Sequence, residues 1–367
     1  MYEEFVSGTP FVFGWGSLTM IGRYLPPGDC FMVSGRSSAR SLGILDRIRE
    51  KIQGELHTFE EIEPNPLDST VDRGAECLKD SKADYILAVG GGSAIDAAKV
   101  INVVATQGGR AYEYMNGSRN VSDPRYPLIA VPTTPGTSSE ITPFAVLTVP
   151  TMMNKVGLRT SELYPDLAMI DPSLTITLPK DQTAATGLDI LSHAFESYWA
   201  RLANPITRRY AIQAVKLIRD HLLGAYKDGK NKEHRKGISL ASVYAGLSFS
   251  NTGTTICHAI SYPITTDSGL PHGMACSMSL PETYDILVEK RAEGMDELAH
   301  AFGSYRNDLS EDLRNFVKSM GAPLSMGEAG FKGGIERIRD TDLKVLQRNL
   351  CVKFDEEDVT RIIKSME

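Results

Sequence analysis

The first half of the chain alternates short apolar runs with amphipathic stretches. Apolar runs at residues 11–13, 30–33, 85–89 and 128–131 predict strands, and a further strand is expected near residues 55–59. Amphipathic helices are predicted at about 39–51 and from the turn-rich EIEPNPLDS to about residue 81. Because strands that alternate with helices form parallel sheets with both faces covered, this half predicts an α/β domain.

The pattern changes after Asp171 and Pro172, where only amphipathic helices follow. They are predicted at about 179–200, 204–227, 233–250, 253–262 and 275–290, with several shorter ones and no convincing strand. A chain of 367 residues exceeds the size at which a single hydrophobic core stops growing, so two domains are expected. We predict an α/β domain with a parallel sheet at 1–174 and an all-helical domain at 175–367.

Two loops in the first half are suited to binding phosphate. GGGSAIDAAK, from Gly90 to Lys99, follows one strand and opens a helix, so its backbone N–H groups can approach a phosphate at the positive helix end. It is neither GxGxxG nor a P-loop, and a plain tight turn remains an alternative. PTTPGTSSE, from Pro132 to Glu140, offers several hydroxyls at the end of the next strand, although it could be only a polar loop. Together the two loops predict one dinucleotide.

Asp189, His193, His258 and His272 form a candidate metal site in the second half. Asp189 and His193 lie four apart in a helical stretch and project from one face. His258 ends TTICH, and His272 follows in LPHGMA after a predicted helix, loop and return. One carboxylate with up to three imidazoles suits Fe(II) or Zn(II) better than Ca(II) or Mg(II). An ordinary helix pair is the alternative; if the site is real, we expect it in the cleft between the two domains.

Composition narrows the function. A net charge of −7 without a long basic run argues against nucleic acid. No apolar run approaches the roughly 20 residues that span a bilayer, and the acidic N-terminus does not resemble a signal peptide, so we expect a cytoplasmic protein without membrane contact. Five scattered cysteines without a CxxC pair argue against a disulfide framework and also against a thiolate zinc site. Cys257 and Cys276 flank two proposed ligands, and we interpret both as buried packing residues.

Four motifs in order resemble one known family. GGGSAIDAAK, PTTPGTSSEIT, GLDILSHAFESYW and the CHAISYP…LPHGMA pair are similar to the iron-dependent (group III) alcohol dehydrogenases, within the wider dehydroquinate synthase-like fold. The resemblance runs from about residue 11 to the C-terminus, and only the last 80 or so residues lack a sharp motif. It implies a homodimeric enzyme that interconverts small aldehydes and alcohols with NAD(P) and a metal, usually Fe(II) and sometimes Zn(II).

The resemblance also implies roles for single residues. Asp189, His193, His258 and His272 match the metal ligands of the family. Gly14 and Gly16 lie where the first strand of the family approaches the cofactor. The residues that match cofactor contacts are Gly91, Gly92, Ser93 and Asp96 in the phosphate-binding turn, Thr133 and Thr134 in the second loop, and Lys155.

Two positions depart from the family pattern. The family has a second histidine four residues after the third ligand, where this chain has Tyr262, so the usual proton relay is in doubt. A tyrosine hydroxyl can donate a proton to an alkoxide, but Tyr262 could equally be a packing residue. NAD-preferring members carry an acid near Gly35; here Arg36, with Ser37 and Ser38, follows instead. Because arginine can pair with a 2′-phosphate through two hydrogen bonds, we favour NADP(H) over NAD(H).

The segment with Tyr262 resembles the branch that reduces phosphonoacetaldehyde to 2-hydroxyethylphosphonate. We therefore expect an aldehyde reductase with Tyr262 and His258 as catalytic residues, His258 acting through the metal. A reductase of simple aliphatic aldehydes is the main alternative. A dehydroquinate synthase-like lyase or cyclase would need a larger set of lysines and arginines, and a catalytically inactive scaffold would not need the intact ligand positions.

Overall fold

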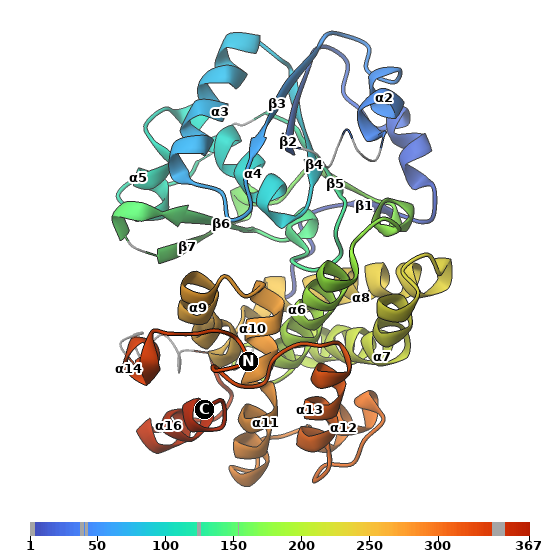
Figure 1. Ribbon diagram of the computed structural model, residues 1–367. Coiled ribbons are helices and arrows are strands. Elements are labelled where there is room, and N and C mark those ends of the chain that lie inside the picture. The colour runs from blue at the N-terminus through green and yellow to red at the C-terminus, as the bar shows by residue number, and fades with distance from the viewer. Residues whose placement is uncertain (1–3, 37–39, 41–42, 123–125, 153, 340–348) are drawn as a thin grey trace. The chain divides into compact units, whose positions relative to one another are not determined.

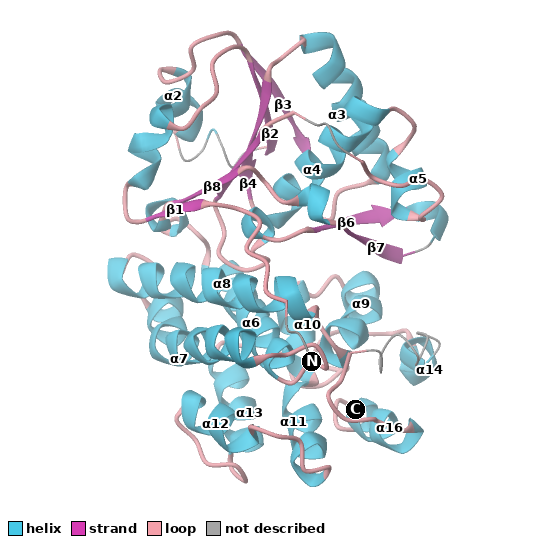
Figure 2. Ribbon diagram, turned by 180° about the vertical axis from the view of Figure 1, so that it is seen from behind, coloured by secondary structure: helices cyan, strands magenta, loops and turns pink. Residues whose placement is uncertain are grey.

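The computed structural model describes residues 4–36, 40, 43–122, 126–152, 154–339 and 349–367 (Figures 1 and 2). The chain forms two compact units, Ser7–Thr177 and Leu178–Glu367 together with Met1–Val6. The N-terminal segment joins the helical unit because the Val6 N–H donates to Asn251 Oδ1 at 2.7 Å, and Asn251 Nδ2 donates back to the Val6 carbonyl at 3.0 Å. The contacts thus divide the chain between residues 177 and 178, whereas the sequence predicts one boundary after residue 174.

A six-stranded parallel sheet forms the centre of the first unit. In spatial order its strands are β1 (Phe11–Phe13), β8 (Leu167–Ile170), β5 (Leu128–Pro132), β4 (Tyr85–Gly90), β2 (Cys30–Gly35) and β3 (Leu56–Ile62). Successive side chains of β4 enter different cores: Ile86 and Ala88 belong to one cluster, and Tyr85, Leu87 and Val89 belong to another. This period of two, buried on both sides, is typical of a parallel sheet covered on both faces.

Helices cover both faces of this sheet (Figure 1). One face carries α3 (Asp68–Ser81), α4 (Gly92–Gln107) and α5 (Ala111–Met115), and the other carries η1 (Ser17–Arg23) and α2 (Ile44–Arg49). Residues 39, 41 and 42 of the helix expected at 39–51 lie outside the described residues. Short 3₁₀ turns occur at Ser139–Ile141, Pro150–Met152, Ser161–Leu163 and Pro172–Thr175.

The sequence does not predict β8 or an antiparallel hairpin of β6 (Phe144–Val149) and β7 (Asn154–Arg159). Both β8 (LAMI) and β6 (FAVLTV) contain apolar runs of four residues, as long as those at 30–33 and 128–131, but these runs were not interpreted as strands. The hairpin contributes Ala145, Leu147 and Val149 to the core beside α3 and α4. The burial of β6 has a period of two, whereas its sequence is apolar at five of six positions, so the alternation becomes visible only in the structure.

All the named elements of the second unit are helices, and an isolated bridge between Ala200 and Leu350 is its only β-type pairing among the described residues. Its helices are α6 (Lys180–Tyr198), α7 (Pro205–Lys227), α8 (Lys232–Thr252), α9 (Ile256–Ser268), α10 (His272–Met278), α11 (Leu280–Glu289), α12 (Met295–Phe302), α13 (Leu309–Ser319), α14 (Gly334–Arg339) and α16 (Glu356–Lys364). α6 is buried almost all round and lies beside α7, α8 and α10 (Figure 2). None of the described helices is long and apolar enough to cross a lipid bilayer.

Two expected helix boundaries in this unit are wrong. α9 continues through Pro263 and ends at Gly269, whose φ of 72° is the left-handed cap conformation. Proline removes one helical N–H donor, but its fixed φ is itself helical, so the helix can continue. The stretch expected as one helix at 275–290 is two helices that meet at Ser279, and the first of them already begins at His272.

Candidate active site

The glycine turn after β4 lies where the strand order of the sheet reverses. The chain passes from β2 to β3 on one side and then crosses to β4 on the other, so the switch point falls between β2 and β4. Their carboxyl ends carry Gly35 and Arg36 in one case and Gly90 and Gly91 in the other. Open α/β sheets bind ligands in the crevice outside such a switch point.

The second loop packs directly on the glycine turn. The Thr133 N–H donates to the Gly90 carbonyl at 2.9 Å, because β4 and β5 are neighbours in the sheet. A Cβ on Gly91 would come within 2.8 Å of the Thr134 hydroxyl, and one on Gly92 would come within 2.4 Å of the Thr137 hydroxyl. Glycine is therefore required for the two loops to meet at the N-terminus of α4.

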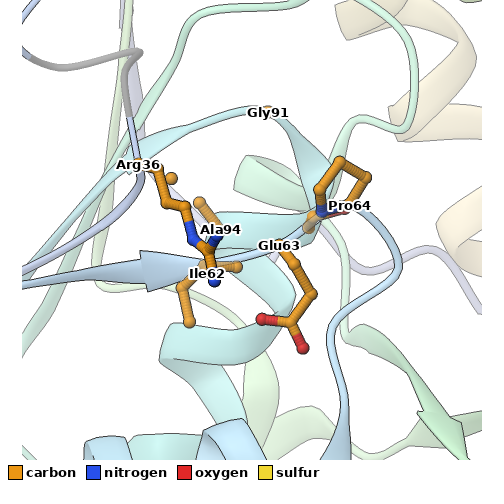
Figure 3. A pocket seen from close by; sticks show the side chains of 8 residues that line it. Arg36, Ile62, Glu63, Pro64, Gly91 and Ala94 are labelled. Carbon is orange, nitrogen blue, oxygen red and sulfur yellow. The ribbon is translucent and has the colours of Figure 1, made fainter.

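A pocket of about 380 Å³ opens at this switch point (Figure 3). Arg36 from the end of β2 and Glu63 from the end of β3 both line it (Figure 3). Glu63 Oε1 already accepts from the Leu67 N–H at 2.9 Å and from the Thr70 hydroxyl at 3.0 Å. The remaining lining residues are Gly35, Ile62, Pro64, Gly91, Ser93 and Ala94.

Other residues expected at the cofactor lie elsewhere in the same unit. Asp96 is buried, and its Oδ2 accepts from the Val146 N–H at 3.0 Å, so this carboxylate holds β6 against α4. Lys155 is half-buried on β7, opposite Thr148. The Gly14 and Gly16 N–H groups, at the end of β1, donate to the Ile170 carbonyl at 3.1 Å and to Asp171 Oδ1 at 2.8 Å. Ser37 and Ser38 lie outside the described residues.

In the helical unit, four side chains bring donor atoms together. Asp189 on α6, His258 on α9, and His272 and Cys276 on α10 each offer one atom, and these atoms lie within 4.8 Å of one another. His258 Nε2 is 3.7 Å from Asp189 Oδ1, and Cys276 Sγ is 3.6 Å from His272 Nε2. Three of the four expected metal ligands thus meet, and a cysteine interpreted as a packing residue joins them.

Glu196 orients His258 from behind. It is fully buried on α6, and its Oε2 is hydrogen-bonded to His258 Nδ1. Its Oε1 accepts from the N–H groups of Thr255 and Cys257, both at 2.9 Å, at the start of α9. A carboxylate on one ring nitrogen of a histidine fixes the tautomer and directs the other nitrogen to a metal. Glu196 was not predicted from the sequence, although it lies seven residues after Asp189 on the same helix face.

Ser261 fixes the tautomer of His272, as Glu196 does for His258. The Ser261 hydroxyl donates its only proton to the His258 carbonyl at 2.6 Å. It also lies 3.2 Å from His272 Nδ1, so the Nδ1–H must be the donor in that contact. His272 Nε2, which lies 3.6 Å from Cys276 Sγ, is therefore the ring nitrogen without a proton.

The two other expected site residues stack on this group. The His193 ring lies 4.5 Å from that of His258 and 4.1 Å from that of Phe249, stacked on both, and His193 is not one of the four residues of the donor group. The Tyr262 ring stacks on His272 with centroids 5.6 Å apart and planes 7° apart. Both side chains thus lie at the edge of the cluster.

The charges of the cluster suit a cation. Burial alone would raise the pKa of Asp189, but the imidazoles beside it, His193 foremost, hold that pKa well below its usual range. Burial alone would lower the pKa of His258, but Cys276 and Glu196 raise it well above its usual range. The carboxylate is therefore ionised, and without a metal a proton occupies the imidazole, which a metal would displace.

This donor set fits a divalent transition metal. Asp189 and His258 are 5% and 3% exposed, and Asp189 Oδ1 and His258 Nε2 face each other at the ion-pair distance of 3.7 Å. Among the described residues neither atom has a hydrogen-bond partner within 3.5 Å. Buried polar atoms normally have partners, so two such atoms pointing at one place indicate a ligand. Carboxylate, imidazole and thiol donors match iron, zinc or cobalt rather than calcium or magnesium.

The first unit has a parallel sheet with a glycine turn at its switch point, and the helical unit has a buried cluster of potential metal ligands. Together they indicate an oxidoreductase that uses a nucleotide cofactor and a metal. Family models agree: "Iron-containing alcohol dehydrogenase" matches residues 8–172, and "Fe-containing alcohol dehydrogenase family, C-terminal" matches residues 183–366. The chain belongs to the iron-containing alcohol dehydrogenase family.

Individual relatives span almost the whole chain. NAD-dependent methanol dehydrogenase of Bacillus methanolicus is 31% identical and covers 89% of this chain and 89% of its own. NADPH-dependent butanol dehydrogenase of Clostridium saccharobutylicum is 31% identical over 89% of this chain and 88% of its own. The structure of sulfoacetaldehyde reductase from Bifidobacterium kashiwanohense in complex with NAD⁺ matches with a TM-score of 0.92 and 27% identity, covering 100% of this chain and 99% of that one.

Proposed function

We propose that this protein is a metal-dependent, NAD(P)H-linked aldehyde reductase with Asp189, His193, His258 and His272 as its metal ligands. The observation that carries the proposal is the pair of buried atoms, Asp189 Oδ1 and His258 Nε2, that have no hydrogen-bond partner among the described residues. Glu196 and Ser261 hold two of the imidazoles in the tautomer that metal binding requires. Fe(II) is the metal we favour, with Zn(II) as the alternative.

The chain's own residues position and protonate the substrate. A bound metal would supply a Lewis acid for the aldehyde oxygen, and bound NAD(P)H would supply the hydride. Burial raises the pKa of Tyr262, so this hydroxyl stays protonated at neutral pH. Tyr262 can therefore donate a proton to the product alkoxide but cannot serve as a base. Its stacking on His272 keeps the hydroxyl beside the metal ligands.

The pocket at the switch point supports NADP(H) as the preferred cofactor. Gly91, Gly92 and Ser93 open α4, where the pyrophosphate of a dinucleotide binds, and Thr133 and Thr134 lie against this turn. Arg36 lines the same pocket from the end of the neighbouring strand. A guanidinium here would pair with a 2′-phosphate, and the acid that NAD-preferring members carry near Gly35 is absent. Glu63 also lines this pocket, but its Oε1 accepts from the Leu67 N–H and the Thr70 hydroxyl.

Phosphonoacetaldehyde is the substrate we favour, with simple aliphatic aldehydes as the alternative. The likeness to a sulfoacetaldehyde reductase supports an aldehyde that carries a compact anionic group. Thr265, three residues after Tyr262 on α9, is buried, and its hydroxyl has no hydrogen-bond partner among the described residues. Such a hydroxyl could bind an anionic oxygen.

The test is reduced-cofactor oxidation by protein reconstituted anaerobically with Fe(II). Phosphonoacetaldehyde, sulfoacetaldehyde and short aliphatic aldehydes would each be offered with NADPH and with NADH. We expect turnover that requires metal, favours the phosphonate and NADPH, and is lost in His258→Ala. If only plain aldehydes are reduced, the assignment of phosphonoacetaldehyde as substrate is wrong. If no aldehyde is reduced, the proposed aldehyde reductase activity is wrong.

A second arm tests the cofactor assignment. Gly35→Asp combined with Arg36→Ala should reverse the preference from NADPH to NADH, because an acid would repel the 2′-phosphate and the guanidinium would be gone. Turnover with saturating NADH should stay unchanged. If the native protein prefers NADH, or if the double variant keeps the preference for NADPH, Arg36 does not determine cofactor preference by binding the 2′-phosphate.

A further inference from the structure

Cys276 is the one member of the donor group that the proposed function leaves unexplained. It is 0% exposed, and its sulfur is 3.6 Å from His272 Nε2 and 3.9 Å from His272 Nδ1. It lies one helical turn after His272 on α10, so both side chains leave the same face of the helix. The thiol is thereby placed among the atoms of Asp189 and His258.

The spacing of these atoms matches coordination by one metal. Metal–sulfur and metal–nitrogen bonds of about 2.3 Å and 2.0–2.1 Å, at the tetrahedral angle, separate the two donors by about 3.6 Å. Cys276 Sγ and His272 Nε2 are 3.6 Å apart, and Asp189 Oδ1 and His258 Nε2 are 3.7 Å apart. The sulfur–nitrogen pair therefore has the separation of two neighbouring ligands of one metal, and the oxygen–nitrogen pair lies slightly beyond the about 3.4 Å expected for its shorter bonds.

Charge also favours a thiolate at this position. A divalent cation held by one carboxylate and neutral imidazoles keeps a net positive charge in a buried site. A thiolate from Cys276 would neutralise that charge, which reduces the cost of burying the ion. The polar neighbours of the cluster do not compete for the cation, because Glu196 faces the Nδ1 side of His258 and Ser261 faces the Nδ1 side of His272.

Cys257 shows what a buried packing cysteine looks like in the same region. It is also fully buried and adjacent in sequence to His258, but its sulfur lies 3.6 Å from the Thr283 hydroxyl. It is absent from the donor group. Burial next to a ligand therefore does not by itself bring a sulfur to the cluster, and Cys257 provides a matched control.

We propose that Cys276 is a further metal ligand, so that this site binds thiophilic divalent cations such as Zn(II) and Co(II) through a mixed oxygen, nitrogen and sulfur set. The inference rests on the proposed metal-binding function and adds a donor to it. When the metal–sulfur bond forms, the thiol releases its proton to solvent and no electrons are transferred. A soft thiolate shifts the preference of the site toward zinc and cobalt, beyond what carboxylate and imidazole provide.

Cobalt is the probe, because thiolate ligation gives Co(II) a near-ultraviolet charge-transfer absorption that oxygen and nitrogen ligands do not give. The full chain, stripped of metal under reducing and anaerobic conditions, would be titrated with Co(II) while bound cobalt is counted by equilibrium dialysis. We expect the charge-transfer absorption to rise with the first equivalent and then stop. It should be lost in Cys276→Ser and Cys276→Ala and kept in Cys257→Ser, with folding checked by circular dichroism.

The outcomes separate this inference from the proposed function. Cobalt that binds to the native protein but not to Asp189→Ala, without the charge-transfer absorption, would overturn the role of Cys276 and leave the metal site standing. An absorption that persists in folded Cys276→Ser would overturn it equally. If the native protein binds no cobalt, the metal-dependent function falls together with this inference. In a zinc competition, Cys276→Ser should bind about 10-fold more weakly or worse, since even indirect partners of a metal are worth 10–100-fold.

Discussion

Lys99 in the α/β unit and Asp189 in the helical unit are both buried charged side chains on helices, but their charges are compensated differently. Lys99 is 1% exposed, and its Nζ donates to the carbonyls of Thr142 at 2.8 Å and Phe144 at 2.7 Å. Burial lowers its pKa to about 8, against the opposing influence of Asp96 and Glu140. This cluster contains its own cation.

The Asp189 cluster has its negative groups and lone pairs in place but holds no lysine or arginine. Among the described residues, the positive charges that act on Asp189 are imidazoles, which release their protons when a metal binds. The difference teaches how to distinguish a structural cluster from a binding one. A lysine that hydrogen-bonds the backbone beside a buried carboxylate indicates a structural contact between two elements. A buried carboxylate among oriented imidazoles indicates a cation-binding site.

Asp189→Ala should have the largest effect on function. Removing the anionic ligand should eliminate stoichiometric metal binding and lower aldehyde turnover by about 10³-fold or more, because Lewis-acid stabilisation is worth several kcal/mol. The measurements are metal content after dialysis and NADPH oxidation. Asp181→Ala, an exposed carboxylate on the same helix, is the control and should keep both. Full turnover in Asp189→Ala would show that the cluster is not the site of reaction.

Lys99→Met should have the largest effect on stability. It leaves Asp96 and Glu140 buried without their cation and two carbonyls without a donor, so we expect a loss of about 3–5 kcal/mol. Urea unfolding of metal-free protein measures it, because bound metal would otherwise add stability. Lys79→Met, at an exposed position on α3, should change little. A loss under about 1 kcal/mol would mean that the cation is not what holds β6 to α4.

Glu196→Gln tests the orientation of His258. The amide oxygen can still accept from the start of α9, but the amide NH₂ would donate to His258 Nδ1 and turn Nε2 into a protonated atom. Metal affinity should therefore fall by about 10–100-fold, measured by competition with a chelator. Glu293→Gln, whose side chain is 89% exposed, should leave the affinity unchanged. Equal affinities in both variants would assign Glu196 to capping α9 alone.

Most strands of the sheet could be predicted from short apolar runs that alternate with helices. β2, β4 and β5 are buried on both faces and were found from their runs, whereas β8 and β6 were missed although their apolar runs are as long as that of β5. The glycine turn was located because a strand ends directly before it. Which loops meet could not be read from the chain, since it depends on the neighbouring positions of β4 and β5 in the sheet.

The site could be predicted only in part, for a similar reason. Spacing and residue type indicated Asp189, His193, His258 and His272, three of which share the donor group. Glu196 was missed because a glutamate near the end of an amphipathic helix usually faces solvent. Cys276 was missed because the residues before it were expected to form a loop; only once α10 begins at His272 does the four-residue spacing place both side chains on one face.

Tyr262→Phe should have the smallest effect and distinguishes a proton donor from a packing ring. The phenylalanine keeps the stacking on His272, so metal binding and stability should change little. If the hydroxyl donates to the alkoxide, kcat for aldehyde reduction should fall by about 10-fold or less, since water can substitute in part. The native kcat should also decline at high pH as Tyr262 ionises above its usual pKa, and this decline should disappear in the variant.

Tyr305→Phe, at a position 70% exposed, is the control. An unchanged kcat and pH profile in Tyr262→Phe would leave Tyr262 a packing residue, and protonation would then pass to solvent.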